Sequence, residues 1–334
     1  MTKNKSNIVK VSFWERNRKS GGYVLKKKLM DIGVSIARFI LLFGLCFLIL
    51  QPIFNKISVS FMTEADLYSP VVISIPQHFT TENYKMAADV MNYSKGLVNT
   101  LVISFTIAVV QIVVCTLVGY GFARFKFPLK SFWFACVMLT ILIPPQVISN
   151  SLYLHFKFFD ILGIIKLIKG VPLNLNGSPV PYYLMSAGCM GLKNGLYIYM
   201  IRQFFRNIPN DMEEAAYVDG CNTVRTFFTI MLPEAKPIIT SCFLFAFVWQ
   251  WTDGFYSKMF LGNTTLLSTS LARLVDGLAA YLMRITGVQT SVSVAFSNCI
   301  LATGVLMLIA PLIILYLFAQ RQFVESISAS GIKM

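Results

Sequence analysis

Long blocks of apolar residues, separated by shorter polar stretches, dominate the pattern along this chain of 334 residues. Each block is close to the ~20 residues that an α-helix needs to cross ~30 Å of hydrocarbon. The blocks cover residues 32–54, 97–122, 132–154, 182–205, 238–256 and 292–318. The pattern therefore predicts an all-helical, multi-pass membrane protein, a bundle of six transmembrane helices.

The third block contains a pair of prolines, Pro144 and Pro145. Proline removes a backbone donor and clashes with the preceding turn, so we expect this span to bend or unwind there. Such a break is tolerated at membrane depth only where protein or a wet cavity covers it. The third and fourth blocks are the least regular of the six.

Composition supports the membrane class: 56% of the residues are hydrophobic and 13% charged, against about a quarter charged in a soluble domain. The net charge of +14 raises the possibility of nucleic-acid binding, which would place Lys and Arg on a soluble folded face. Here these residues lie between apolar blocks, so nucleic acid is not an expected partner.

The distribution of positive charge predicts the orientation. With the N-terminus inside the cell, the cytoplasmic connections and tails hold twice as many Lys and Arg as the outer connections. Both termini are then cytoplasmic in a bacterial cell membrane. We expect residues 1–30 to form a basic, uncleaved cytoplasmic segment on anionic lipid, and residues 31–334 to form the transmembrane domain.

Catalytic chemistry is absent from the sequence. There is no G-x-x-x-x-G-K-[ST] loop for nucleotide phosphates, and His78 and His155 are too far apart to form a metal pair. None of the seven cysteines forms a C-x-x-C pair, and most lie in apolar blocks. We expect no enzyme activity, no metal site and no cofactor bound by this chain. Energy for transport would come from a partner or from an ion gradient.

The connection at residues 206–236, cytoplasmic by the charge count, is long enough to have a structure of its own. Asn210 with Glu213 three residues later predicts a capping box at the start of a short helix. Gly220 predicts the end of that helix, because glycine adopts the left-handed conformation at low cost.

A second short helix is predicted to begin with a cap at Asn222 or Thr223 and to stop at Pro233. The small residues Ala215 and Ala216 in the first helix permit close approach of another backbone. From the residues alone, the loop is either a docking element or a self-contained surface hairpin.

One motif favours docking. The segment reads Glu214-Ala215-Ala216, three residues, Gly220, nine residues, Ile230, one residue and Leu232-Pro233. It resembles at every position the E-A-A-x3-G-x9-I-x-L-P signature of permeases of binding-protein-dependent ABC importers. Residues 202–209 and 320–333 resemble the carbohydrate-uptake branch, in particular its maltose-permease-G-like member. The resemblance covers the second block to the C-terminus, with departures at 161–179 and after the first block.

The resemblance implies a set of partners. They are a second, similar permease, two cytoplasmic ATPases that bind ATP and Mg²⁺, an extracellular or periplasmic solute-binding protein, and a sugar as cargo. The first short helix would insert into a groove on an ATPase and transmit its closure to the spans. The residues assigned to ATPase coupling are Glu213, Glu214, Ala215, Ala216, Asp219, Gly220, Ile230, Leu232 and Pro233.

A path for sugar needs polar groups and flat apolar surfaces inside the bundle. Intramembrane ionisable groups are costly and point to function by default. The candidates for the substrate path are Lys193, Asn194, Asn150, Trp249, Gln250, Trp251, Asp253 and Tyr256. As alternatives, the aromatic residues anchor the end of a span at the membrane interface, and Lys193 pairs with Asp253 or extends into a wet lumen.

Two other functions stay open from the sequence. The same type of importer can take a peptide, an amino acid or an anion. An ion-coupled secondary carrier or channel would need no ATPase, but paired charges within the spans or inverted repeats are expected there and are not evident.

Overall fold

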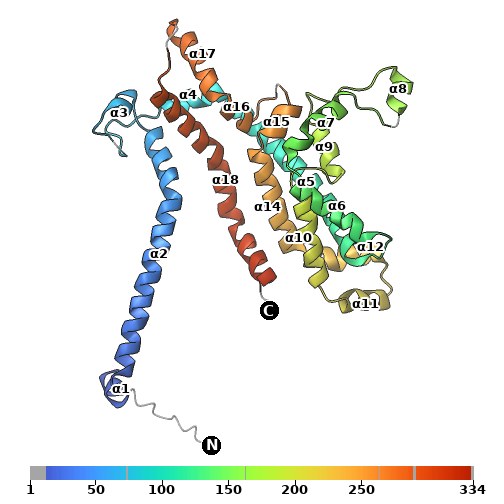
Figure 1. Ribbon diagram of the computed structural model, residues 1–334, viewed down its shortest axis with the longest axis horizontal. Helices are drawn as coiled ribbons and strands as arrows, with labels where there is room; N and C mark the ends of the chain where they lie inside the picture. Colours follow the sequence, from blue (N-terminus) through green and yellow to red (C-terminus); the bar gives the residue numbers. More distant parts are fainter. Residues whose placement is uncertain (1–12, 73, 162, 263, 289–290, 332–334) are drawn as a thin grey trace, which may run out of the picture. The chain divides into compact units, whose positions relative to one another are not determined.

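The computed structural model describes residues 13–72, 74–161, 163–262, 264–288 and 291–331. Across these residues every regular element is a helix, apart from two isolated antiparallel bridges, in agreement with the predicted all-helical class (Figure 1). The chain divides into two compact units, residues 1–58 and residues 59–334.

The first unit contains α1 (Phe13–Lys19) and nearly all of α2 (Tyr23–Ser60). With 38 residues at 1.5 Å each, α2 is about 57 Å long, more than the ~30 Å of hydrocarbon in a bilayer. Its most apolar 18-residue window has a mean hydropathy of 2.4. None of the described residues of this unit covers that surface, so α2 needs lipid or protein around it. The helix begins inside the basic segment expected at residues 1–30, of which residues 1–12 lie outside the described residues.

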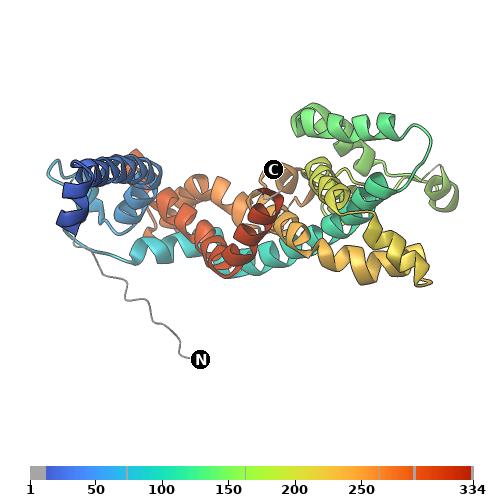
Figure 2. The ribbon, with the colours of Figure 1, turned by 90° about the horizontal axis from the view of Figure 1, so that it is seen from below.

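Four helices form the centre of the second unit: α5 (Tyr93–Arg124), α10 (Asn194–Asn207), α14 (Lys236–Thr252) and α18 (Val294–Gly331). α5 packs against α10 and α14, and α14 also packs against α18 (Figures 1 and 2). Buried apolar side chains from all four join one cluster. Its members include Ile112 and Cys115 from α5, Tyr197 and Ile201 from α10, Cys242 and Ala246 from α14, and Ile300 and Leu308 from α18.

Shorter helices lie at the two ends of this unit. One end has α3 (Glu64–Tyr68), α4 (Glu82–Met91), α8 (Ile164–Lys169), α15 (Phe255–Phe260), α16 (Leu267–Ala272) and α17 (Leu274–Thr286). The other end has α11 (Asp211–Val218), α12 (Thr223–Thr226), the π-helical turn η1 (Phe227–Met231) and α13 (Leu232–Glu234).

The third predicted block is bent where its prolines predict. It comprises α6 (Lys130–Leu142) and α7 (Pro145–Lys157), whose axes meet at 102°. A second bend, of 74°, separates the segment Thr223–Glu234 from α14. Among the described residues, three continuous helices and these two bent pairs are long and apolar enough to cross a membrane, which gives up to five spans.

The fourth predicted block, residues 182–205, is not one continuous helix. It is divided into α9 (Val180–Ala187) and α10 by the loop 188–193. Cys189 and Lys193 in this loop have φ of 59° and 63°, a left-handed conformation that cannot continue a helix. Apolar composition does not reveal such a break.

Gly195 allows α10 to lie directly against α6. A Cβ at this position would lie 2.9 Å from the carbonyl oxygen of Val137 and would also meet Thr140. We expect Gly195→Ala to destabilise the protein by about 1–3 kcal/mol, because two packed backbones would have to separate. The measurement is the thermal unfolding midpoint of the purified protein. Gly254→Ala is the matched control, since a Cβ there meets nothing within 4 Å, and an equal midpoint for both variants would contradict the prediction.

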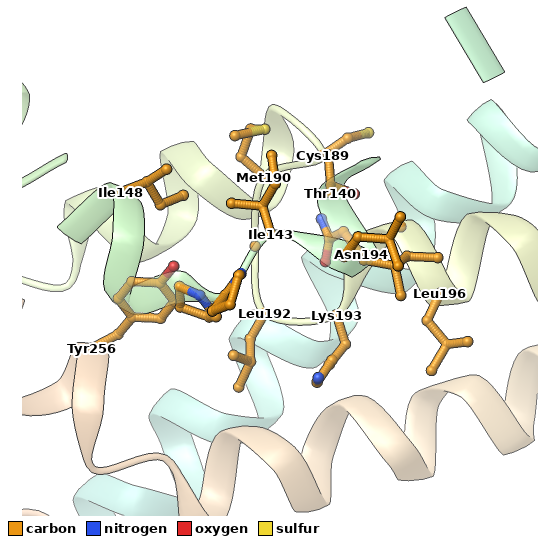
Figure 3. Close-up of a pocket in the computed structure, with 16 residues that line it drawn as sticks. Thr140, Ile143, Ile148, Cys189, Met190, Leu192, Lys193, Asn194, Leu196 and Tyr256 are labelled. Atoms are coloured by element: carbon orange, nitrogen blue, oxygen red, sulfur yellow. The ribbon is translucent and has the colours of Figure 1, made fainter. Parts of the chain in front are cut away.

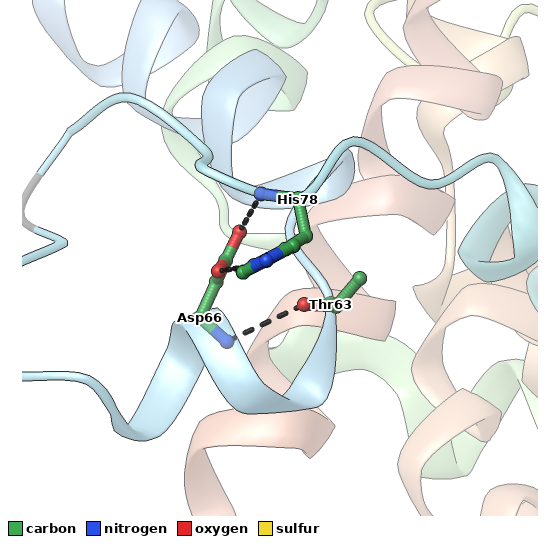
Figure 4. A network of polar contacts seen from close by, with 3 residues as sticks. All are labelled: Thr63, Asp66 and His78. Carbon is green, nitrogen blue, oxygen red and sulfur yellow. Dashed lines mark hydrogen bonds and ion pairs between the residues drawn. The ribbon is translucent and has the colours of Figure 1, made fainter.

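A polar network fastens the segment after α3 at one end of the second unit (Figure 4). The backbone N–H of His78 donates to Asp66 Oδ2 at 2.8 Å, and the His78 ring Nδ1 lies 2.8 Å from Oδ1. Thr63 caps α3 by accepting from the Asp66 N–H. The hydrogen bond from the His78 side chain, followed by that from its backbone, holds the pKa of the Asp66 carboxyl below its ordinary value. The Asp66 carboxylate therefore stays ionised at neutral pH and holds His78 beside α3.

Candidate functional site

The motif segment forms a compact helical hairpin at one end of the second unit. Gly220 has φ of 81° and follows the end of α11, as its position in the sequence predicts. Its N–H donates to the Tyr217 carbonyl at 3.0 Å, and the Cys221 N–H donates to the Ala216 carbonyl at 2.9 Å. This pair of bonds is the Schellman motif, which satisfies carbonyls that a helix end leaves unpaired.

The cap of the second short helix was predicted correctly. The Asn222 side chain accepts from the Arg225 N–H at 2.8 Å and begins α12. The stop at Pro233 is displaced: the helical run extends to Glu234 and breaks at Ala235. Within the motif, Ile230 and Leu232 are half-buried and Pro233 is exposed.

The predicted capping box at Asn210 and Glu213 is not formed. Asn210 makes no side-chain cap, and its Oδ1 instead accepts from Arg124 Nη1 at the end of α5. The Glu213 side chain turns inward, where it cannot reach the N-terminus of its own helix. The local sequence pattern indicates a possible cap, but it does not show that Arg124 from another helix binds both side chains.

Arg124 connects α11 to the membrane helices. Its Nε lies 3.2 Å from Glu213 Oε2, in an ion pair whose two side chains are only 10% and 9% exposed. Its Nη2 donates to the Ile208 carbonyl at 2.7 Å, and Tyr120 donates to Glu213 Oε1 at 3.0 Å. Arg124 thus ties the start of α11 to α5, a role that the charge count in the sequence did not identify.

The rest of α11 points away from the protein. Glu213 and Ala216 are buried, whereas Glu214, Ala215 and Asp219 are exposed. Val218 is 88% exposed at the end of the helix. One face of α11 is therefore fixed to the bundle and the opposite face is free for a partner. Glu213, which the sequence assigned to ATPase coupling, lies on the fixed face.

The predicted substrate-path residues separate into two groups. The side chains of the first group are buried in the packed interior. Trp251 donates from Nε1 to the Leu308 carbonyl at 3.1 Å, and the neighbouring Gln250 is also buried. Asp253 caps α15 by accepting from the Ser257 N–H at 2.9 Å and also accepts from the Tyr182 hydroxyl. These contacts show that Trp251 and Asp253 take part in the packing of α14 and α15.

The second group lies at a cavity of about 370 Å³ (Figure 3). Its walls are the α6–α7 break, the segment 189–196 and Tyr256. Figure 3 shows Tyr256 on one side of this cavity and Asn194 beside Thr140 on the other. Asn194 is fully buried, and its Oδ1 has no hydrogen-bond partner. The proline break in α6–α7 thus borders a hollow, as expected for irregular backbone at membrane depth.

Lys193 also lines this cavity, but its side chain points toward α14. Its Nζ lies 5.0 Å from the centre of the Trp249 ring, in a cation–π contact. The alternative pairing with Asp253 is not observed, because Asp253 binds Tyr182 and the start of α15. Asn150 is exposed on α7 and is not part of the cavity wall.

No group of three or more His, Cys, Asp or Glu residues in the described part of the chain could hold a metal ion. Two features remain as candidates for a functional site: the exposed face of α11 and the cavity beside the α6–α7 break.

Comparison with known families decides what these features belong to. Residues 115–328 match the family described as "Binding-protein-dependent transport system inner membrane component". The chain belongs to this family. It is the permease subunit of a binding-protein-dependent ABC importer, located in the membrane as a multi-pass protein. This family provides the membrane component and not the ATPase, which confirms that the chain is not an enzyme.

Curated relatives agree with this assignment, and a solved structure has a similar fold. The sn-glycerol-3-phosphate transport system permease protein of Brucella abortus is 26% identical over 302 residues, which are 87% of this chain and 95% of that protein. The maltodextrin transport system permease protein of Bacillus subtilis is 24% identical over 255 residues, 76% and 81% of the two chains. The fold is similar to a chain of a bacterial ABC transporter that imports the acidic polysaccharide alginate. The TM-score is 0.59 at 18% identity, with coverage of 88% of this chain and 98% of that one.

Proposed function

We propose that this permease, paired with a second similar permease, forms the transport path for a saccharide. A solute-binding protein outside the cell delivers the cargo, and two cytoplasmic ATPases drive the cycle. Both termini are then cytoplasmic. The chain crosses the membrane six times, with α9 and α10 as one interrupted crossing. The support for the saccharide is the maltodextrin relative and the carbohydrate-type residues around the motif.

The observation on which the proposal depends is the two-sided construction of α11. The Arg124–Glu213 ion pair fixes one side to α5, while Glu214, Ala215 and Asp219 lie exposed on the other. A helix that is rigidly attached to a membrane helix and free on its outer face can transmit the movement of a bound ATPase. Gly220, Ile230, Leu232 and Pro233 shape the hairpin that holds α11 in this position.

The test is whether position 215 on α11 lies next to the ATPase subunit in the assembled importer. Ala215→Cys, treated with a short thiol crosslinker, should form a covalent adduct with the ATPase subunit, because Ala215 lies on the exposed face. The control is Val71→Cys, an exposed position in the segment after α3 at the other end of the unit, which should form none. Absence of an ATPase adduct at position 215 in an assembled importer would reject the coupling role.

One observation favours an anionic saccharide as cargo. Lys193 lines the cavity, and among the described residues no carboxylate forms an ion pair with it. A cation beside an apolar cavity attracts a carboxylate or phosphate, and Tyr256 in the cavity wall offers a flat surface for a sugar ring. Two of the relatives bear names that mention anionic cargo, glycerol-3-phosphate and the acidic polysaccharide alginate.

We expect Lys193→Met to lower uptake of an anionic sugar about tenfold, the effect of one partly screened charge pair, and to leave a neutral sugar unchanged. Lys193→Arg keeps the charge and should retain uptake of both. The measurement is uptake of radiolabelled uronate oligosaccharide, sugar phosphate and neutral maltodextrin by cells with equal amounts of assembled importer. Equal effects of Lys193→Met on charged and neutral sugars would contradict the prediction.

A further inference from the structure

The segment between α7 and α9, residues 158–179, projects from one end of the second unit, and we call it the finger. Phe159 and Leu173 exchange two backbone hydrogen bonds of 3.0 Å, and the Leu175 N–H donates to the Phe156 carbonyl at 2.9 Å. These bonds close the base of the finger. Its tip, the short helix α8, lies at the margin of the unit in both Figure 1 and Figure 2.

The tip has a defined structure and is not a loose loop. Asp160 Oδ1 accepts from the Ile165 N–H at 2.9 Å, which fixes the approach to α8. Gly163 and Gly170 have φ of 83° and 77° and flank the helix on both sides. The Gly170 N–H donates to the Lys166 carbonyl at 2.8 Å. These contacts define the position of α8 relative to Asp160 and the two flanking glycines.

Those side chains are aliphatic and uncovered. Leu167 is 86% exposed, Ile168 76% and Val171 64%, and about half of Ile161 and Ile164 is exposed as well. We call these five residues the apolar tip. A group of exposed aliphatic side chains within eleven residues indicates contact with lipid or with a protein.

Positive charge surrounds the apolar tip. Lys166 and Lys169 lie on α8, and Lys157 lies at the base of the finger. The single acidic residue of the finger, Asp160, uses its Oδ1 to accept backbone N–H groups. The finger therefore has a net positive charge next to its aliphatic side chains.

Composition distinguishes lipid from protein as the surface that covers the tip. Protein interfaces are enriched in Tyr, Trp, Met and Arg and are poor in Lys. Elements that lie on a membrane combine an apolar face with Lys and Arg, whose long side chains reach the phosphate groups. The five residues of the apolar tip are aliphatic, and the charged residues of α8 beside them are lysines, which matches the membrane case.

We propose that the finger is a membrane anchor that binds anionic phospholipid. The apolar tip enters the acyl region, and Lys166 and Lys169 contact the phosphates of the headgroups. The inference rests on the placement of the chain as a membrane subunit, and the orientation proposed above puts the finger in the outer leaflet. The anchor holds the wall of the cavity, because α7 leads directly from the cavity to the finger.

The test uses a photoreactive benzophenone amino acid at position 167 of the complete importer. The importer is reconstituted in nanodiscs of phosphatidylcholine and phosphatidylglycerol and illuminated, and mass spectrometry identifies the adducts. We expect lipid adducts at position 167 to be at least tenfold more abundant than at position 218. Val218 is the matched control, because it is equally exposed but lies on α11.

Two further results test the contact of the lysines with the headgroups and the identity of the surface that covers the apolar tip. In the double variant Lys166→Glu, Lys169→Glu, the share of phosphatidylglycerol among the adducts should fall to its share in the bilayer. Adducts at position 167 with the binding protein or the second permease, or no lipid adduct, would overturn the proposal. The probe at position 218 reports contact with the ATPase, so failure of the coupling role would be seen separately from failure of the anchor.

Discussion

Arg124→Ala is expected to reduce uptake by about a hundredfold while the importer still inserts into the membrane. The substitution leaves the Glu213 carboxylate enclosed without its cation and also removes the contacts with Asn210 and Ile208. Removing one partner of a buried ion pair costs about 3 kcal/mol, which is roughly a hundredfold in the population of the attached state. α11 would then move independently of α5, and the closure of the ATPases would no longer reach the spans.

The measurement is uptake of labelled cargo, normalised to the amount of importer in the membrane. Uptake by Arg124→Lys should be intermediate. An ammonium group keeps the charge, but it lacks the planar guanidinium geometry that makes three contacts at once. Full uptake in Arg124→Ala would show that the ion pair is dispensable for coupling.

Gly220→Pro is expected to abolish transport. Proline fixes φ near −65°, whereas this position has φ of 81°, so the reversal after α11 cannot form. The substitution also removes the N–H that donates to the Tyr217 carbonyl. The direction of the chain into α12 would change, and the exposed face of α11 would lose its position.

Two assays and one control define this result. Uptake and binding-protein-stimulated ATPase activity should both fall to background, while the amount of chain in the membrane stays unchanged. Gly220→Asn should retain most activity, since asparagine tolerates the left-handed region better than other residues. Normal uptake together with copurification of the ATPase in Gly220→Pro would contradict the role assigned to this hairpin.

The local geometry that depends on neighbouring residues was predictable from the sequence. The bend at Pro144 and Pro145, the left-handed Gly220 and the cap at Asn222 all follow from the properties of single residues. The motif that contains Gly220 also led to the correct family. In each case the cause and the effect lie within a few positions of each other.

Features that depend on distant residues were not predictable. Glu213 reads as an acidic residue in the first turn of a helix, and only the fold brings Arg124 beside it. Trp251 reads as an aromatic residue at a span end, but it is buried against α18. The break at 188–193 depends on left-handed Cys189 and Lys193, residue types that rarely adopt that conformation.

The long helix α2 has a consequence for how the protein is made. Nearly all of α2 lies in the first compact unit, and its apolar stretch needs no later part of the chain to complete its backbone hydrogen bonds. The ribosome can therefore deliver α2 into the bilayer as an independent first stage, while α5 to α18 are still being synthesised. Its early insertion would set the topology of every segment that emerges after it.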